Sequence, residues 1–255
     1  MVLTEYTIET DKVTHDYTFI MLSDLHNKSF KKILDIVDAN NPNAIFVVGD
    51  IVDRHMRTSG RARPFLKACL KIAPTFFSLG NHEVQYPVIS KEQFEKTGVI
   101  VLDDSFVCFE DFAIGGQTSK SQNLTWLYDF THQDKFLILL DHHPENYKSY
   151  LKDHFKCIDL ILSGHTHGGQ IKICGQGLFS PGQGLFPKYT HGFYDGKLIV
   201  NAGLVNTGGL IPRIKNPPEI VKINIKKKKE EYKKQGNTKN KEKRKNVKSI
   251  KNVKK

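Results

Sequence analysis

The chain has 255 residues, which is long enough for one α/β domain with a sizeable core. Its formal net charge of +11 comes from residues 226–255, which hold fifteen Lys and Arg against three Glu, whereas residues 1–225 hold 23 basic and 24 acidic residues. The body of the chain is therefore close to neutral, which argues against a strongly basic nucleic-acid-binding domain.

The four cysteines are widely spaced and form no Cys-x-x-Cys pair, so they indicate neither a zinc ribbon nor a disulfide framework. No stretch approaches the roughly 18 apolar residues of a membrane span. We therefore expect a cytoplasmic protein with one domain over residues 1–225 and a disordered lysine-rich tail over residues 226–255. The tail is either a solvated appendage or a peripheral contact with an anionic membrane or nucleic acid. Its one aromatic residue, Tyr232, offers little for stacking on bases.

Short apolar strand patterns alternate with helical patterns along the chain. Taken in order, the expected strands are residues 3–10, 17–23, 43–48, 75–79, 136–140, 158–162, 197–201 and 219–225. Helical patterns cover residues 31–39 and 61–72, and residues 175–196, rich in Gly, Pro and aromatic side chains, indicate a long loop or hairpin. This alternation predicts an α/β architecture.

Five of the expected strands end in Asp, Asn or His. The motifs are Asp24-x-His26, Gly49-Asp50-x-x-Asp53, Gly80-Asn81-His82-Glu83, His142-x-Pro144 and Gly164-His165-Thr166-His167. In open α/β sheets ligands bind just outside the carboxyl ends of the strands. Oxygen and imidazole donors at five such ends therefore predict a shared metal centre. Taken alone, His165 and His167 would also fit exposed histidines at a strand end.

In this order, the motifs resemble those of the calcineurin-like metallophosphoesterases, whose pattern is D-x-H, G-D-x-x-D, G-N-H-[DE], H-x-P and G-H-x-H. The stretches SDLHN and GHTHGGQ, with Pro212-Arg213 and Pro217-Pro218-Glu219-Ile220, look like the bacterial YkuE/YaeI-type phosphodiesterase branch. The resemblance covers about Thr18 to Ile225. It implies a four-layer αββα sandwich of two mixed β-sheets flanked by helices.

The resemblance also implies a site for two divalent metal ions. Its ligands would be Asp24, His26 and His167 for the first ion, Asn81, His142 and His165 for the second, and Asp50 as the bridge. His143 competes with His142 for its place, although the family pattern His-x-Pro favours His142. Two ions about 3.5–4 Å apart need a bridging carboxylate to offset their repulsion. A donor set without thiolate suits Mn, Fe, Zn or Co, with Mn favoured.

Other residues gain roles from the same resemblance. His82 would stabilise or protonate the leaving oxygen, and Asp53 and Glu83 would orient His82 or the ligands. Arg213 is expected either to bind a substrate phosphate or to form an ion pair with Glu219. Aromatic residues of the loop would either floor an apolar substrate pocket or pack in the core; they are Phe179, Phe186, Tyr189, Phe193 and Tyr194.

The expected function is metal-dependent hydrolysis of a phosphoester, with a phosphodiester favoured. A phosphomonoesterase would use the same ligands. A lipid pyrophosphatase acting on UDP-2,3-diacylglucosamine shares the core signature, but such enzymes tend to have arginine where this chain has His82. The alternative from another class is a non-catalytic module that binds a membrane or nucleic acid.

Overall fold

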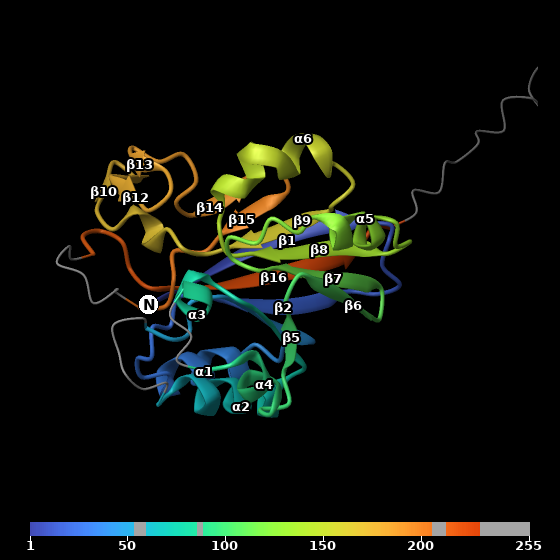
Figure 1. Ribbon diagram of the computed structural model, residues 1–255, viewed down its shortest axis with the longest axis horizontal. Coiled ribbons are helices and arrows are strands. Elements are labelled where there is room, and N and C mark those ends of the chain that lie inside the picture. The colour runs from blue at the N-terminus through green and yellow to red at the C-terminus, as the bar shows by residue number, and fades with distance from the viewer. Residues whose placement is uncertain (54–59, 86–88, 206–212, 230–255) are drawn as a thin grey trace, which may run out of the picture.

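Two six-stranded mixed sheets pack face to face in the computed structural model, which describes residues 1–53, 60–85, 89–205 and 213–229 (Figure 1). The first sheet has the order β1 (Val2–Thr10), β16 (Glu219–Lys227), β2 (Tyr17–Leu22), β3 (Ala44–Val48), β4 (Thr75–Ser78) and β5 (Ile100–Leu102). The second has the order β14 (Gly192–Tyr194), β15 (Leu198–Val200), β9 (Leu160–Ser163), β8 (Phe136–Asp141), β7 (Phe112–Gln117) and β6 (Ser105–Phe109).

Helices cover the outer face of each sheet. Below the first sheet in Figure 1 lie α1 (Lys31–Ala39), α2 (Ala62–Ile72) and α4 (Lys91–Glu95). Against the second sheet pack α5 (Thr125–Thr131) and the helical turn η1 (Tyr147–Leu151), which continues into the short helix α6 (Lys152–His154). The four layers confirm the expected αββα sandwich.

Strand β2 illustrates how the layers are built. Phe19 and Met21 point into the core between the sheets, whereas Ile20 and Leu22 point into the core beneath α1 and α2. A strand buried on both faces needs apolar residues at successive positions, because its side chains alternate between the faces. The apolar residues of the run YTFIML are therefore consecutive rather than alternating with polar ones.

The carboxyl ends of five strands meet at one end of the sandwich. In the first sheet β2, β3 and β4 are parallel neighbours, and in the second sheet β8 and β9 are parallel neighbours. The expected motifs follow these ends, and the short helix α3 (Asn81–Gln85) begins there. The fold thus brings segments from both sheets to one place.

A small lobe stands beside this end (Figure 1). It holds two short hairpins, β10 (Lys172–Ile173) with β11 (Gln176–Gly177) and β12 (Phe179–Ser180) with β13 (Gly184–Leu185). It follows the one-turn helix η2 (His167–Gly169) directly. We call residues 170–188 the hairpin lobe.

Several expectations fall at the limits of the described residues. Strand β16 continues to Lys227, so the first two residues of the expected tail belong to the sheet. Residues 230–255 and Pro212 lie outside the described residues, and the disordered tail stays a prediction. Across the described ranges, no helix combines the length and the apolar character needed to cross a membrane.

Candidate metal centre

The loops that follow β2 and β3 continue to pair beyond the end of the first sheet. The amide of Asp24 donates to the carbonyl of Gly49 (3.1 Å), and that of His26 donates to the carbonyl of Asp50 (3.1 Å). These bonds hold the two carboxylate-bearing loops side by side. All seven expected ligands are at most 9% exposed.

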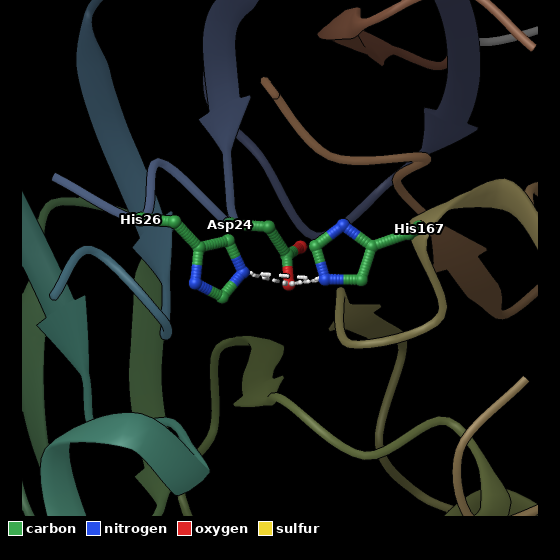
Figure 2. A group of neighbouring side chains, drawn as sticks. All are labelled: Asp24, His26 and His167. Atoms are coloured by element: carbon green, nitrogen blue, oxygen red, sulfur yellow. Dashed lines mark hydrogen bonds and ion pairs between the residues drawn. The ribbon is translucent and has the colours of Figure 1, made fainter. Parts of the chain in front are cut away.

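Asp24, His26 and His167 form the first group of donors (Figure 2). Asp24 Oδ1 lies 3.9 Å from His26 Nε2 and 3.5 Å from His167 Nε2, and the two ring nitrogens are 3.2 Å apart. Donor atoms bound at about 2.0–2.2 Å around a tetrahedral ion are about 3.4 Å from one another. Two ring lone pairs at this separation would repel each other unless a proton or a cation lay between them. The triangle therefore fits one divalent metal ion.

Asp50, His142 and His165 form a second group of donors. Asp50 Oδ2 lies 3.1 Å from His142 Nε2. Asp50 also groups with His26 and His82, so its carboxylate faces both the first and the second set of donors. This position suits a carboxylate shared between two ions.

Buried donor atoms without hydrogen bonds support the same fit. Among the described residues, Asn81 Oδ1, His26 Nδ1 and His167 Nδ1 are buried side-chain atoms without a hydrogen-bond partner. A buried polar atom with no partner costs about 1–3 kcal/mol, so such a concentration needs an explanation. Metal coordination would satisfy the Asn81 oxygen, which belongs to the expected second site.

Burial keeps three of the imidazoles neutral. It lowers the pKa of His26 to about 4, that of His167 to about 4, and that of His165 well below its usual value. A neutral imidazole has a free lone pair, which metal binding requires. Three of the four expected histidine ligands are therefore neutral near pH 7, whereas Asp50 raises the pKa of the buried His142 to about 10.

His142 and His143 have different partners. The His142 Nδ1 lies 2.8 Å from the carbonyl oxygen of Val48, an arrangement in which Nδ1–H donates and Nε2 is left to face Asp50. Metal-bound histidines commonly use their second nitrogen in this way. The His143 ring instead contacts Ser119 Oγ through Nε2 (2.6 Å) and Glu145 Oε1 through Nδ1 (3.1 Å). This geometry favours His142 as the ligand.

His82 lies between two carboxylates at the edge of the centre. Its Nε2 is 3.8 Å from Asp50 Oδ2 and its Nδ1 is 4.0 Å from Asp53 Oδ1. Its backbone amide donates to Asp50 Oδ1 (2.9 Å). His82 is more exposed than the rings of His26 and His142. The structure thus brings His82 and Asp53 together beside the expected ligands.

Glu83 anchors two of the motif loops. One of its oxygens accepts the amides of Asp50 (2.8 Å) and Gly80 (2.8 Å), and the other accepts those of Ile51 (2.9 Å) and Val52 (3.0 Å). The G-N-H-E motif therefore holds the G-D-x-x-D loop in place through its last residue.

Two glycines are required by close approach. A Cβ on Gly49 would lie 2.5 Å from His142 Nδ1, and Gly49 has a positive φ of 72°. A Cβ on Gly164 would lie 2.7 Å from Asp24 Oδ2. Only glycine permits these contacts between motif loops from the two sheets.

Arg213 bonds to the main chain. Its guanidinium donates to the carbonyls of Gly203 (3.1 Å), Val205 (3.1 Å) and Ala202. Glu219, the partner expected in the alternative, accepts the amide of Ala202 (2.7 Å), and no ion pair between these two side chains occurs within the described residues. Contact between Arg213 and a substrate stays a prediction.

Asn216, Glu145 and Ser119 were not anticipated from the sequence. Asn216 Nδ2 donates to the carbonyls of His167 (2.6 Å) and Gln170 (3.1 Å), and so supports the turn that presents His167. Glu145 and Ser119 hold the ring of His143. Glu145 lies two residues from His143 and was the one with a visible sequence signal.

The sequence of this chain is similar to those of known metallophosphoesterases. An uncharacterized metallophosphoesterase of Aquifex aeolicus is 27% identical over 245 residues, covering 87% of this chain and 90% of that protein. Uncharacterized metallophosphoesterase YkuE of Bacillus subtilis is 27% identical over 260 residues, covering 88% of this chain and 85% of YkuE. For the metallophosphoesterase Cj0846 of Campylobacter jejuni, at 28% identity over 242 residues, this chain spans 62% of its length.

Among solved structures, that of TT1561 of Thermus thermophilus aligns with a TM-score of 0.47 at 12% identity, covering 73% of this chain and 89% of that chain. The family model described as calcineurin-like phosphoesterase matches residues 17–169, which contain every expected ligand. The chain therefore belongs to the calcineurin-like phosphoesterase family, whose members are phosphoester hydrolases.

Proposed function

We propose that this chain hydrolyses phosphodiesters at a centre that holds two divalent metal ions. The observation that carries the proposal is the pair of buried donor groups joined by Asp50, which faces both. Sharing one carboxylate brings two cations close together, as hydrolysis by a two-metal centre requires. The preference for a diester rests on the resemblance to the YkuE/YaeI-type branch.

The proposed ligands divide between the two ions. Asp24, His26 and His167 would hold the first, Asn81, His142 and His165 would hold the second, and Asp50 would bridge them. When bound, such ions lower the pKa of water and offset negative charge on the phosphate oxygens. The mixture of carboxylate, amide and imidazole donors suits Mn, Fe, Zn or Co, and we favour Mn.

The residues of the chain supply the remaining steps. His82 would carry a proton toward the leaving oxygen, with Asp53 beside its Nδ1 to keep the ring oriented. Glu83 would keep the Asp50 loop in register with the Asn81 loop through its four backbone hydrogen bonds. Arg213 would bind a substrate phosphate through its Nε, which has no hydrogen-bond partner within the described residues.

The test is hydrolysis of a chromogenic phosphodiester and the matching monoester by the Mn-loaded protein. Asp50→Asn is expected to abolish hydrolysis, because the amide cannot bridge two cations as a carboxylate does. The exposed Asp153→Asn serves as the matched control and is expected to retain full activity. The ratio of the two rates decides between a diesterase and a monoesterase. Equal activity of the Asp50 variant and the intact protein would refute the two-metal proposal.

A further inference from the structure

The hairpin lobe exposes large apolar side chains. Ile173 is 56% exposed, Phe179 40%, Leu185 69% and Phe186 68%, and the adjacent Ile214 is 46% exposed. These five are nearly half of the eleven large hydrophobic residues exposed within the described part of the chain. Scattered single hydrophobics are ordinary on a protein surface, but a cluster on one projecting feature indicates an interaction site.

Cross-strand pairing places several of these side chains together. Phe179 faces Leu185 across the β12–β13 hairpin, and side chains of directly paired residues lie on the same face. Ile214 is joined to the lobe by two contacts. Its carbonyl accepts a hydrogen bond from the amide of Lys172 (3.0 Å), and Ile214 forms a parallel β-bridge with Ile171. The apolar residues are therefore carried by one continuous feature.

Polar contacts within the lobe and with the residues that follow it fix its shape. Gln183 donates to the carbonyl of Tyr189 (2.8 Å) and accepts its amide (3.0 Å), and Gln176 donates to the carbonyl of Pro187 (2.6 Å). Thr166, between the expected ligands His165 and His167, donates to the carbonyl of Thr190 (2.6 Å). The exposed side chains thus stand on a preformed base that is joined to the metal centre.

The hairpin lobe itself contains lysines but no acidic residue. Between Leu160 and Tyr194 the sequence contains no Asp or Glu, and the lobe carries Lys172 and Lys188, the latter exposed. The adjoining segment adds the exposed Lys215. The neighbouring carboxylate of Glu145 approaches the lobe at Gly182 and pairs with His143. A lobe that has lysines and protruding apolar side chains, with no acidic residue of its own, matches the interfacial region of a bilayer, where lysines meet anionic headgroups and apolar groups enter the acyl boundary.

We propose that the hairpin lobe docks on an anionic lipid bilayer through Ile173, Phe179, Leu185 and Phe186, with its lysines at the headgroups. A single-stranded nucleic acid would need stacking surfaces, but Ile173 and Leu185 are aliphatic and as exposed as the two phenylalanines. Because η2 leads directly into the lobe, docking brings the metal centre to the membrane surface. The proposal does not depend on the phosphodiesterase proposal, since binding is measured without catalysis.

The test is sedimentation of the EDTA-treated full chain with vesicles of phosphatidylglycerol and phosphatidylcholine. The lobe variant is Leu185→Ser with Phe186→Asn, since asparagine tolerates the φ of 51° at residue 186. The matched control is Leu70→Ser with Tyr128→Ser, which removes exposed apolar side chains elsewhere. Binding is measured at about 0.15 M and about 0.5 M NaCl, because the higher salt screens attraction by the lysine-rich tail.

We expect the lobe variant to partition onto these vesicles about tenfold or more weakly than the intact chain, and the control to bind as the intact chain does. A far-UV circular dichroism spectrum and a Tm equal to those of the intact chain would show that the lobe variant retains its fold. Equal binding by the lobe and control variants would overturn the proposal. So would an intact chain that binds single-stranded DNA but not the vesicles, or that binds neither.

Discussion

At the scale of single residues, the metal centre combines backbone strain with buried donors. Asp24, His26, Asp50, His165 and His167 have φ values of 56°, 46°, 53°, 69° and 47°. Each non-glycine residue in this left-handed region costs about 1–3 kcal/mol and persists only where its surroundings hold it. Here the paired motif loops and the Glu83 hydrogen bonds hold them. Positive φ values also occur in turns elsewhere, as at Asn41 and Asp104, so the strain supports the site only in combination with the buried donors.

Substitution of His82 tests its proposed catalytic role directly. We expect His82→Ala to lower kcat by about 10²–10⁴-fold, because a positioned proton donor contributes on that scale. Asp53→Asn should lower kcat less, about tenfold, since in the proposed mechanism Asp53 would act through the ring of His82. Metal content is measured in parallel, and the exposed His154→Ala is the control. A loss of bound metal equal to the loss of activity would instead make His82 a ligand, as its grouping with His26 and Asp50 allows.

The buried histidines should make the stability of the metal-free protein depend on pH. Burial lowers the pKa of His26 and His167 from 6.5 to about 4. Between pH 6.5 and about pH 4, these histidines therefore bind protons in the unfolded chain but not in the folded protein. Their contribution to the free energy of unfolding is fully present above about pH 6.5 and is lost as the pH falls to about 4. Burial raises the pKa of Glu83 to about 7 and that of Asp141 to about 6. The contribution of these two carboxyls to the free energy of unfolding therefore decreases as the pH rises, opposite to that of the histidines.

A double variant separates the two effects. His26→Asn with His167→Asn removes the titrating rings and keeps residues that tolerate left-handed backbone. Urea unfolding in EDTA, from pH 7 to pH 4, should show the intact protein losing stability relative to this variant as the pH falls. Parallel curves for the two proteins would contradict the assignment of neutral, buried imidazoles.

At the scale of elements, Glu83 joins the start of α3 to the loop after β3. Glutamine has one acceptor oxygen in place of two, so Glu83→Gln leaves buried amides such as those of Ile51 and Val52 facing an NH₂ group. We expect a loss of about 2–4 kcal/mol in the free energy of unfolding at pH 8 and a metal affinity about 10–100-fold weaker. The exposed Glu92→Gln on α4 is the control. Unchanged metal affinity in the Glu83 variant would show that the loops hold their register without it.

Much of the element pattern could be predicted from the sequence. The helical pattern at residues 31–39 coincides with α1, and the run at residues 17–23 contains β2. These segments were recognisable because their apolar spacing is set by burial against a neighbouring layer. The hairpin β6–β7 was not anticipated, because β6 is only partly buried and two glycines interrupt β7. The local signal there is weak.

His142 and His143 could not be distinguished from their local sequence alone. Both follow the same strand, and the sequence offered only the family pattern His-x-Pro to separate them. The contacts that distinguish them reach Val48, Ser119 and Glu145. Val48 and Ser119 are distant in the sequence, so no spacing rule could have revealed the geometry.

At the scale of the whole molecule, the number and order of the sheets could not be read from periodicity. A strand that is buried on both faces shows the same continuous apolar run whether the protein contains one sheet or two. The two-sheet sandwich was therefore expected from the family resemblance alone. Strand β1 pairs in parallel with β16, more than 200 residues away along the chain, and β16 also pairs with β2. Such pairing depends on which edges are left open once the core has formed.

The metal centre spans the two sheets, and this location should couple metal binding to the stability of the whole molecule. Asp24, Asp50 and Asn81 follow strands of the first sheet, whereas His142, His165 and His167 follow strands of the second. Metal at about 100 times its Kd adds about 2.7 kcal/mol to the free energy of unfolding. For a chain of this size, that corresponds to about 5–10 °C in Tm.

We therefore expect removal of metal by EDTA to lower Tm by about this amount and re-addition of Mn to restore it. Hydrogen exchange shows whether the metal ions stabilise both sheets together or only one of them. If the ions join the sheets, amides at the carboxyl ends of both β3 and β9 should exchange faster after chelation, because the loops they support belong to one cluster. If faster exchange were confined to one sheet, the two donor groups would act separately, and Asp50 would lose its assigned place as the bridge between them.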